Sequence, residues 1–418
     1  MREMKNSGTE WLSDIPHDWT LSNIGSLYTM RNVKVSDRDY PPLSVTMKGV
    51  VPQLETAAKT DAHDDRKLVR KGDFAINSRS DRRGSCGIAD RDGSVSLINT
   101  ILAPRTKMNP DYYNWLFHST SFADEFYRWG HGIVDDLWTT RWQEMKKIDV
   151  PVPSYEEQAQ IASTLETECT KVDALIANQE AQIEKLKVYK QSLIAEIVTK
   201  GLDSNVPMKD SGVEWIGLIP KHWNTIATKY LFRIESGATP KSENPEYFDG
   251  DIPWITPADY KTEEVFVFGG RRNISELGLK SCSTTLIPKG SLIFSKRAPI
   301  GAVAINAEEL CTNQGCLSCI PKKEDIVKYY YYVMSGCTEQ YNLLGSGTTC
   351  KEISATNFAN FVLPNPSVSE QEEMVAYLDE KCSKVDRLIA IKNAKIDKLN
   401  KYKKSLIYEY GTGKKEVM

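Results

Sequence analysis

The sequence contains one motif twice, and this repeat constrains the architecture more than any other feature. Met-Lys-Asn-Ser-Gly-Thr-Glu-Trp begins at Met4, and Met-Lys-Asp-Ser-Gly-Val-Glu-Trp begins at Met208, an offset of 204 residues. Each copy continues with Ile-Pro and a further tryptophan, which is Trp19 in the first copy and Trp223 in the second. A motif repeated at one fixed offset indicates that the chain is an internal duplication.

A second pair of similar segments closes the two halves. Residues 153–194 recur as residues 366–407, an offset of 213 residues, and both copies keep the Glu-Gln, Lys-Val-Asp and Ser-Leu-Ile positions. Residues 20–150 and 224–362, which lie between the matched segments, share only scattered features. The chain therefore has a repeated frame that carries two different inserts. Because function usually resides in what varies on a fixed scaffold, the inserts are expected to perform two separate recognition tasks.

The closing segments are predicted to be long helices. Neither Gly nor Pro occurs from Ser154 to Lys200 or from Ser367 to Tyr410, and both segments are rich in residues that favour helix. In each copy the first serine is followed three residues later by a glutamate, which is the spacing of an N-terminal capping pair.

Apolar side chains in both helices follow the 3–4 alternation that is typical of a coiled-coil seam. The alternation is interrupted at the same two places, by Gln179 and Lys190 in the first copy and by Lys392 and Lys403 in the second. This shared register predicts that the helices pair with each other, in antiparallel fashion. The alternative is that each amphipathic helix packs only on its own insert. The predicted seam positions are Val172, Ile176, Ile183, Leu186, Leu193, Val385, Ile389, Ile396, Leu399 and Leu406.

Each insert mixes short β-branched runs with turn signals and short helices, which indicates an α/β rather than an all-helical fold. The predicted fold class is therefore α/β, or α+β. Two α/β domains are joined by two long helices that form an antiparallel coiled coil with pseudo-two-fold symmetry.

Basic residues follow a predicted buried strand at matching places in both inserts. The strands are residues 73–76 and 291–294. The basic residues after them are Arg79, Arg82, Arg83, Lys296 and Arg297. The planar guanidinium of arginine suits guanine edges and phosphates, so these loops are candidates for DNA contact. The alternative is a solvated surface loop with no ligand.

A second group of candidates lies in the second insert alone. Asn313 and Gln314 carry amides of the kind that pair with adenine, although a structural turn is an equal alternative. Lys241, Arg271 and Arg272 are further candidates for phosphate contact.

Composition excludes several classes of protein. The chain has 418 residues, 40% of them hydrophobic, and a net charge of −3, so any DNA contact needs a local basic surface. No apolar run is long enough for a signal peptide or a membrane span. Nine cysteines in such a chain favour reduced thiols, and we expect a cytoplasmic protein.

No motif for catalysis is present. A structural zinc site needs four ligands, and Cys316 and Cys319 form the only Cys-x-x-Cys pair, so no metal site is expected. The five histidines are scattered, and nucleotide-binding and methyltransferase motifs are missing. The tyrosines at 112–113 and 329–332 have helix-like spacing and are predicted to be core residues. The sequence predicts a protein without catalytic residues.

The frame resembles the specificity subunit of Type I restriction-modification systems, in which two target-recognition domains alternate with two conserved helical regions. The shared features are the tryptophan-containing opening of each half, the Pro-x-Pro…Glu-Gln start of each helix and the Tyr-Lys-x-Ser-Leu-Ile segment. Residues 237–240, 252–255 and 312–315 resemble recurrent features of one type of recognition domain. The implied domains are 1–150 (first target-recognition domain), 151–203 (central helical region), 204–362 (second target-recognition domain) and 363–418 (distal helical region).

The resemblance implies a subunit that reads a bipartite, asymmetric site in double-stranded DNA. It also implies docking, through the two helices, of two methyltransferase subunits and of restriction subunits that translocate and cut DNA. S-adenosylmethionine, ATP and magnesium are then expected on those partners, with no cofactor on this chain.

Three alternatives remain open at this point. A closely related possibility is the recognition subunit of a Type IIB enzyme, whose partner combines methylation and cleavage. A nuclease with a cryptic active site would need clustered acidic residues at metal-binding spacing, which the sequence does not display. A purely structural coiled-coil adaptor would leave two large, divergent inserts without a role.

Overall fold

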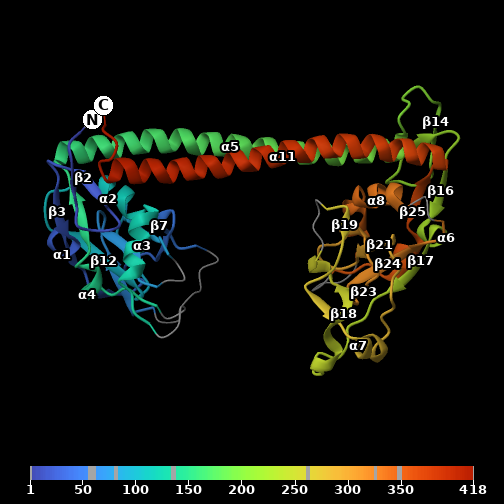
Figure 1. Ribbon diagram of the computed structural model, residues 1–418, viewed down its shortest axis with the longest axis horizontal. Coiled ribbons are helices and arrows are strands. Elements are labelled where there is room, and N and C mark those ends of the chain that lie inside the picture. The colour runs from blue at the N-terminus through green and yellow to red at the C-terminus, as the bar shows by residue number, and fades with distance from the viewer. Residues whose placement is uncertain are drawn as a thin grey trace. The chain divides into compact units, whose positions relative to one another are not determined.

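The computed structural model describes the chain apart from short segments. The described residues are 2–54, 63–79, 83–132, 138–259, 264–323, 327–345 and 351–417. They form two compact units. Unit 1 comprises Met1–Glu180 and Asn393–Met418, and unit 2 comprises Ala181–Lys392. Both limits fall inside the long helices α5 (Tyr155–Lys200) and α11 (Val368–Gly411), so each helix contributes one half to each unit (Figure 1).

Unit 1 contains an α/β insert built mainly from short strands. Its strands are β1 (Met4–Asn6), β2 (Asp14–Pro16), β3 (Thr20–Asn23), β4 (Tyr28–Met30), β5 (Lys34–Val35), β6 (Leu43–Thr46), β7 (Gly49–Pro52), β8 (Arg66–Val69), β9 (Phe74–Asn77), β10 (Cys86–Ile88), β11 (Gly93–Val95), β12 (Asn99–Pro104) and β13 (Asp149–Val152). Its short helices are α1 (Ile24–Leu27), α2 (Pro110–Phe117), α3 (Thr120–Arg128) and α4 (Trp142–Met145).

The main sheet of unit 1 has the strand order β10-β9-β12-β4, and a smaller sheet has the order β11-β8-β5. Strand β9 is buried at every position, as the sequence pattern at residues 73–76 predicts. Helices α2 and α3 cover this sheet, because Phe117 of α2 packs 4.7 Å from Phe74 and 4.5 Å from Phe122 of α3, measured between ring centroids.

Unit 2 contains a second α/β insert. Its strands are β14 (Met208–Asp210), β15 (Leu218–Pro220), β16 (Asn224–Ala227), β17 (Phe232–Ser236), β18 (Phe248–Ile255), β19 (Phe266–Val267), β20 (Arg272–Ile274), β21 (Leu292–Ser295), β22 (Val303–Asn306), β23 (Cys311–Thr312), β24 (Cys316–Pro321) and β25 (Val362–Asn365). Its helices are α6 (Thr228–Leu231), α7 (Glu276–Ser281), α8 (Val327–Ser335), α9 (Thr338–Leu344) and α10 (Ala355–Asn360).

The main sheet of unit 2 has the order β17-β24-β21-β22-β19, and β20-β18-β23 forms a smaller one. Most pairings are antiparallel, but β19 runs parallel to β22 and β23 runs parallel to β18. Strand β21 is buried at every residue and occupies the place that β9 has in unit 1. This mixture of helices and mainly antiparallel sheet confirms the predicted α/β or α+β class.

The repeated opening motif forms the same hairpin in both units. Strand β1 pairs with β2 and β14 pairs with β15, with Met4 opposite Pro16 and Met208 opposite Pro220. The Ser-Gly step after the first strand explains why the motif is kept. Gly212 has a φ of 71°, a left-handed conformation that favours glycine. Its counterpart in the first hairpin, Gly8, has a φ of 76°.

The repeated Pro-Ser-x-x-Glu-Gln sequence fixes where each long helix begins. Ser154 and Ser367 cap α5 and α11 by accepting hydrogen bonds from the backbone N–H of Glu157 (3.2 Å) and Glu370 (3.4 Å). The glutamine that follows donates its side-chain N–H to the carbonyl of the proline two residues before the helix start, which is Pro153 in the first copy (2.9 Å). The equivalent bond at the start of α11 measures 3.1 Å.

The glutamates of the capping pairs also tie each helix to its own insert. The indole N–H of Trp19 donates to Glu157 at 2.9 Å, and that of Trp223 donates to Glu370 at 2.8 Å. Both tryptophans are 1% exposed, so the repeated tryptophan is a buried anchor with a satisfied donor.

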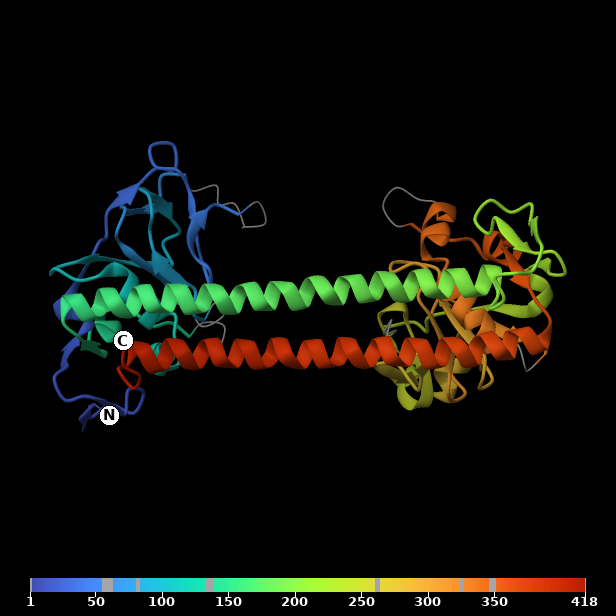
Figure 2. The ribbon, with the colours of Figure 1, turned by 90° about the horizontal axis from the view of Figure 1, so that it is seen from above.

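Each insert also holds the end of the helix from the other half of the chain. In unit 1 the Tyr112 hydroxyl donates to the carbonyl of Gly411, at the end of α11, at 2.9 Å. In unit 2 the Tyr329 hydroxyl donates to the carbonyl of Val198, near the end of α5, at 3.0 Å. Within each unit, therefore, one helix begins where the other ends, and the two halves run antiparallel, side by side in Figures 1 and 2.

The predicted seam lies in the helix pair of each unit, and none of its ten positions is exposed. Two of the polar interruptions form matched ion pairs. Lys403 contacts Asp173 at 2.6 Å in unit 1, and Lys190 contacts Asp386 at 2.7 Å in unit 2. The antiparallel coiled coil is confirmed, and the alternative, in which each helix packs only on its own insert, is wrong.

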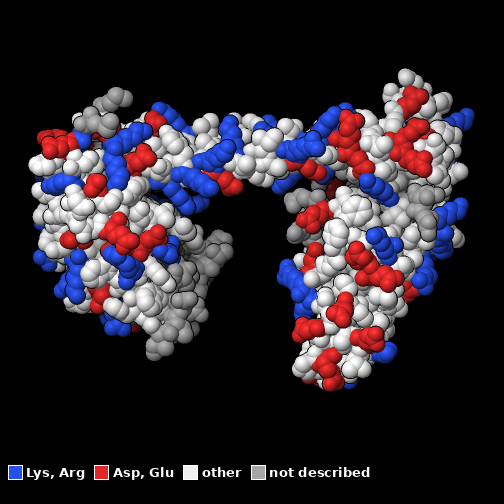
Figure 3. All heavy atoms as spheres, in the orientation of Figure 1, with Lys and Arg blue, Asp and Glu red and all other residues white. Residues whose placement is uncertain are grey.

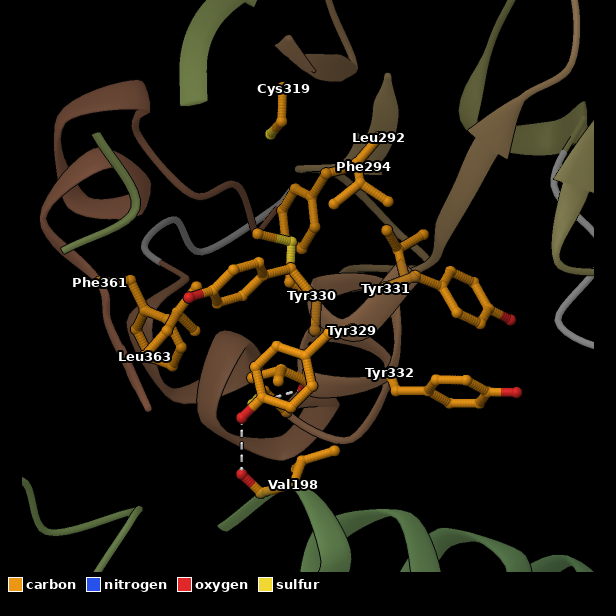
Figure 4. Packing of buried hydrophobic residues seen from close by; sticks show 14 of the residues in the cluster. Val198, Leu292, Phe294, Cys319, Tyr329, Tyr330, Tyr331, Tyr332, Phe361 and Leu363 are labelled. Carbon is orange, nitrogen blue, oxygen red and sulfur yellow. Dashed lines mark hydrogen bonds between the residues drawn. The ribbon is translucent and has the colours of Figure 1, made fainter. Parts of the chain in front are cut away.

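Both helices contribute to the core of each unit. In unit 1 the cluster includes Leu165 of α5 and Leu406 of α11, and in unit 2 it includes Leu378 of α11 and Ile197 of α5. Figure 4 shows the tyrosines of α8 with other members of the unit 2 cluster, among them Val198 of α5, Phe294 and Leu363, and each of residues 329–332 is at most 7% exposed. The prediction that they are core residues is confirmed. The segment limits at 150, 203 and 362 stay a prediction, because the compact units divide the chain inside the helices.

Candidate nucleic-acid interface

Lys296 and Arg297 lie at the end of the central strand β21 of unit 2. The turn after the strand is held locally, since the Ser295 hydroxyl donates to the Arg297 carbonyl at 2.7 Å. The chain then returns through Gly301, whose N–H donates to the Ser295 carbonyl at 3.0 Å. The two basic residues are thus presented on a tight hairpin at the end of a rigid buried strand.

One carboxylate faces both of these cations. Glu352 lies 2.9 Å from Nζ of Lys296 and 2.8 Å from Nε of Arg297. Partial burial acts to raise the pKa of Glu352, but the hydrogen bonds and charges of the two basic residues outweigh it and hold that pKa below its ordinary value. The side chain of Lys296 is only 13% exposed, so the loop is less free than its sequence suggests.

Asn313 and Gln314 lie in a turn that contacts the same hairpin. The side chain of Asn313 accepts a hydrogen bond from the N–H of Gly315 at 2.9 Å, which makes this asparagine structural. The Gly315 carbonyl accepts from the backbone N–H of Lys296 at 2.9 Å. Gln314 is exposed and accepts a hydrogen bond from the hydroxyl of Thr239. Gln314 is therefore the amide that is placed to contact a ligand.

The loop that carries Thr239 approaches this turn closely. A Cβ atom at Gly237 would lie 2.2 Å from the carbonyl oxygen of Thr312, so only glycine fits there. This close approach explains why the Gly-Ala-Thr-Pro sequence (residues 237–240) has a glycine where it packs against the Thr-Asn-Gln-Gly sequence (residues 312–315). Lys241, two residues after Thr239, is exposed at the end of the same loop.

Arg271 and Arg272 are positioned by two different contacts. The carboxylate of Asp259, 4% exposed, accepts from the backbone N–H of Arg271 at 3.1 Å and from that of Thr256 at 2.8 Å. The guanidinium of Arg272 lies over the ring of Phe248, 4.0 Å from its centroid. Both arginine side chains belong to exposed residues, so their outer edges remain accessible.

These segments form one continuous set of loops, which we call the loop cluster. The turn at Gly315 also packs against the Thr256–Asp259 turn, because a Cβ at Gly315 would lie 2.8 Å from Cγ of Pro257. The loop cluster comprises residues 237–241, 256–259, 269–272, 295–297, 312–315 and Glu352. All the candidate residues of the second insert lie in it, although they are spread over 74 positions of the sequence, from Lys241 to Gln314.

In unit 1 the equivalent strand end carries Arg79 and Arg83, while Arg82 lies outside the described residues. Arg79 is exposed and pairs in a short β-bridge with Thr139. Arg83 is committed to helix α3, because it is ion-paired with Asp124 and its guanidinium lies 4.7 Å from the ring centroid of Tyr127. Arg79 is thus the more available of the two described arginines for a ligand.

Sequence reasoning missed Asp259, Thr139 and Glu352, and it included Thr239 only within residues 237–240. The three missed residues are small or acidic, have no motif of their own, and act on residues that are not their neighbours in the sequence. The close pairing of glycine-containing segments was the one usable signal for Thr239. Nothing in the local sequence around Glu352 indicates that it faces two cations 55 and 56 positions earlier.

Charged groups are mixed on the surface. On the face of unit 2 in Figure 3, Lys and Arg alternate with Asp and Glu and form no single basic patch. In the described part of the chain, no group of three or more His, Cys, Asp or Glu side chains is placed to hold a metal ion. Across those same residues, no helix is long and apolar enough to cross a membrane.

The chain is similar to known proteins along its whole length. Residues 220–401 match the model of the Type I restriction modification DNA specificity domain. The MjaIX specificity subunit of Methanocaldococcus jannaschii is 38% identical over 166 residues, which are 39% of this chain and 38% of that protein. The chain thus spans little more than a third of that relative. The MjaVIII specificity subunit of the same organism is 26% identical over 438 residues, covering 96% of this chain and 94% of that protein.

The architecture also has a solved counterpart. A structure described under complex assembly and conformational transition of the type I R-M system aligns with a TM-score of 0.72 at 15% identity, covering 96% of this chain and 99% of that chain. At 15% identity this structural similarity supports a shared fold and nothing more. The matched domain and the relatives show that the chain is similar to Type I restriction-modification specificity subunits.

Proposed function

We propose that this chain is the DNA-sequence-specificity subunit of a Type I restriction-modification complex and reads a bipartite, asymmetric site. The observation that carries the proposal is the loop cluster. Basic and amide side chains from distant parts of the second insert converge there on rigid supports, as base and phosphate contacts require. Unit 1 carries a different set of residues at the equivalent strand end, so its half-site is expected to differ.

In this proposal the chain itself catalyses no reaction. Methyl transfer and cleavage are assigned to partner subunits, on which S-adenosylmethionine, ATP and magnesium are expected, and the complex is expected in the cytoplasm. Purified chain that transferred methyl groups without a partner would contradict this assignment, as would metal-dependent cleavage by the chain alone.

The test is a map of methylated adenines in cells that express the chain with a methyltransferase subunit. We expect a two-part sequence, with one part altered by R79A and the other by Q314A. A lost base contact costs about 1–3 kcal/mol and relaxes specificity at one position, whereas a lost phosphate contact weakens binding evenly and reduces the salt dependence. Alanine variants of Lys241, Arg271 and Arg272 are distinguished in the same way, by their specificity and salt dependence. A map without any shared sequence would contradict the proposal.

We also propose that the helix pair docks two copies of one partner, the methyltransferase subunit. In unit 1 Leu175 and Tyr402 are 46% and 49% exposed, and in unit 2 Leu388 and Tyr189 are 47% and 53% exposed. The first pair becomes the second by the 213-residue offset of the repeat. Each leucine directly precedes a seam position, and each tyrosine directly precedes a lysine that interrupts the seam, so both members of a pair flank the seam from the same side. Large exposed apolar side chains at matched places favour protein contact, and their duplication favours two equal partners.

Native mass spectrometry of the assembled complex tests this docking. The variant L175S/Y402S is expected to lose one partner copy, as is L388S/Y189S, while all four substitutions together are expected to lose both. The control K398S replaces an exposed lysine on the same helix and is expected to keep both copies. Full stoichiometry in the fourfold variant would show that the partner binds elsewhere.

A further inference from the structure

The strand ends of the two units share one backbone contact. In unit 1 the N–H of Thr140 donates to the carbonyl of Ser78, and in unit 2 the N–H of Ile353 donates to that of Lys296, each at 3.0 Å. The adjoining β-bridges pair Arg79 with Thr139 and Arg297 with Glu352. Thr139 and Glu352 are separated by the 213 residues of the repeat. They are equivalent positions, one with a hydroxyl and the other with a carboxylate.

The carboxylate of Glu352 changes what the two basic residues of unit 2 can do. Lys296 points to Glu352 at 2.9 Å with a side chain that is 13% exposed, so a phosphate contact from Lys296 requires this ion pair to break. The two positive charges of Lys296 and Arg297 face the one negative charge of Glu352, so these three side chains together carry a net charge of +1.

Arg297 is held in a different way from Lys296. Its side chain is 42% exposed, and Glu352 accepts a hydrogen bond from Nε at 2.8 Å. The two Nη groups, which form the outer edge of the guanidinium, have no bond to another described residue. A bond at Nε therefore fixes the plane of the guanidinium and leaves the edge that pairs with guanine directed away from the carboxylate.

We propose that Glu352 is a positioning residue that sets the specificity of the second recognition unit. It orients Arg297 for base contact and keeps Lys296 from binding phosphate, so that affinity in this unit depends on sequence more than on the DNA backbone. The inference rests on the proposed DNA-reading function. The ligand is duplex DNA, and the residue acts through Arg297 and Lys296 without touching DNA itself.

The substitution E352Q tests the proposal because it keeps the shape of the side chain and removes its charge. Lys296 is then free to bind a phosphate, and each added phosphate contact makes the slope of log affinity against log salt steeper by about 0.9. With the assembled complex, we expect affinity for a duplex of unrelated sequence to rise about 3- to 10-fold at 0.1 M salt. Discrimination at one position of the second half-site is expected to fall about 10-fold, with the first half-site unchanged.

Two further variants separate this role from a general effect of charge or folding. The double variant E352Q/K296M is expected to restore the wild-type salt slope, because it removes the released lysine. The variant E309Q removes an exposed carboxylate elsewhere in unit 2 and is expected to leave the slope and the discrimination unchanged. The variant E352D keeps the charge and is expected to retain most of the discrimination.

The outcomes are distinct for the two proposals. An E352Q complex with wild-type salt slope and discrimination would overturn the role of Glu352, as would equal loss at both half-sites. A double variant that kept the steep slope would also overturn it. A wild-type complex that showed no sequence preference would instead contradict the proposed function.

Discussion

Unit 1 and unit 2 agree wherever a helix end must be held and differ wherever a ligand is to be met. The Trp–Glu bond at each helix start and the Tyr–carbonyl bond at each helix end occur in both units with nearly equal distances. At the end of the central strand, by contrast, unit 1 presents Thr139 and unit 2 presents Glu352 beside their arginines. Duplication has thus preserved contacts that satisfy buried polar groups, because losing one leaves a buried donor or acceptor unpaired.

The same comparison separates two uses of charge. In the frame, charged side chains bind each other across the helix pair or cap helix ends. In the inserts, they hold exposed basic groups in place, as Asp124 holds Arg83 and Glu352 holds Arg297. The net charge of −3 is therefore compatible with DNA contact, since the basic groups that matter are presented singly on rigid loops.

The largest expected effect tests whether the frame is energetically the same in both units. Leu165 and Leu378 are equivalent, and both are fully buried in the core of their unit. L165A and L378A should each destabilise the unit concerned by about 2–5 kcal/mol, because truncation leaves a cavity. Hydrogen exchange followed separately in the two units measures this. A large cost in one unit and almost none in the other would break the comparison.

A smaller effect is expected from Glu370 at low pH. Partial burial acts to raise the pKa of Glu370, but hydrogen bonds from Ser367, Trp223 and His222 outweigh it and lower that pKa to about 2 from an ordinary 4.5. A lowered pKa in the folded state gives a stabilisation that is complete above about pH 4.5 and lost as the pH falls towards 2. E370Q should therefore flatten the acid-induced loss of stability of unit 2, measured by unfolding between these pH values. The variant E372Q, at an exposed position two residues later, is the control. An unchanged acid profile in E370Q would exclude this contribution.

The tyrosines at the helix ends sharpen the comparison further. Y112F and Y329F each remove one buried hydroxyl that donates to a helix-end carbonyl, at an expected cost of about 0.5–1.5 kcal/mol. Because the two bonds are equivalent, the costs should agree, as denaturant unfolding followed by hydrogen exchange in each unit can determine. Y331F, in the same core as Tyr329, removes a hydroxyl that bonds no helix-end carbonyl among the described residues, and it serves as reference for the loss of a hydroxyl alone. A reference variant as costly as the other two would show that the helix-end bonds are not special.

The smallest effect is expected at the matched ion pairs of the seam. Asp173 and Asp386 are 57% and 41% exposed, and such pairs contribute at most about 1 kcal/mol because water and salt screen them. D173N and D386N should lower stability slightly and equally, with the difference from wild type vanishing in high salt. An unequal effect, or one that survives 1 M salt, would mean that the two pairs are not equivalent.

Much of the frame was predictable from the sequence. The capping serines, the helical segments without Gly or Pro and the seam register all depend on residues that are close together in the chain. The structure places the helices at Tyr155–Lys200 and Val368–Gly411, as that pattern indicates. The buried strands before the basic residues were also predictable, because short apolar runs bounded by turn residues are local signals. The individual basic and amide residues were predictable as candidates only, since exposure and partners are not written in a local pattern.

By itself, then, the sequence determined the duplication, the two helices with their common register and the buried strands, because periodicity and capping act over a few residues. The tertiary structure decided which candidates meet. Sheet order brings Thr239 to Gln314 and the segment after α9 back to the strand end, where Glu352 faces Lys296 and Arg297. Such contacts join residues 55 or more positions apart, and they depend on how the whole insert packs, which no local pattern encodes.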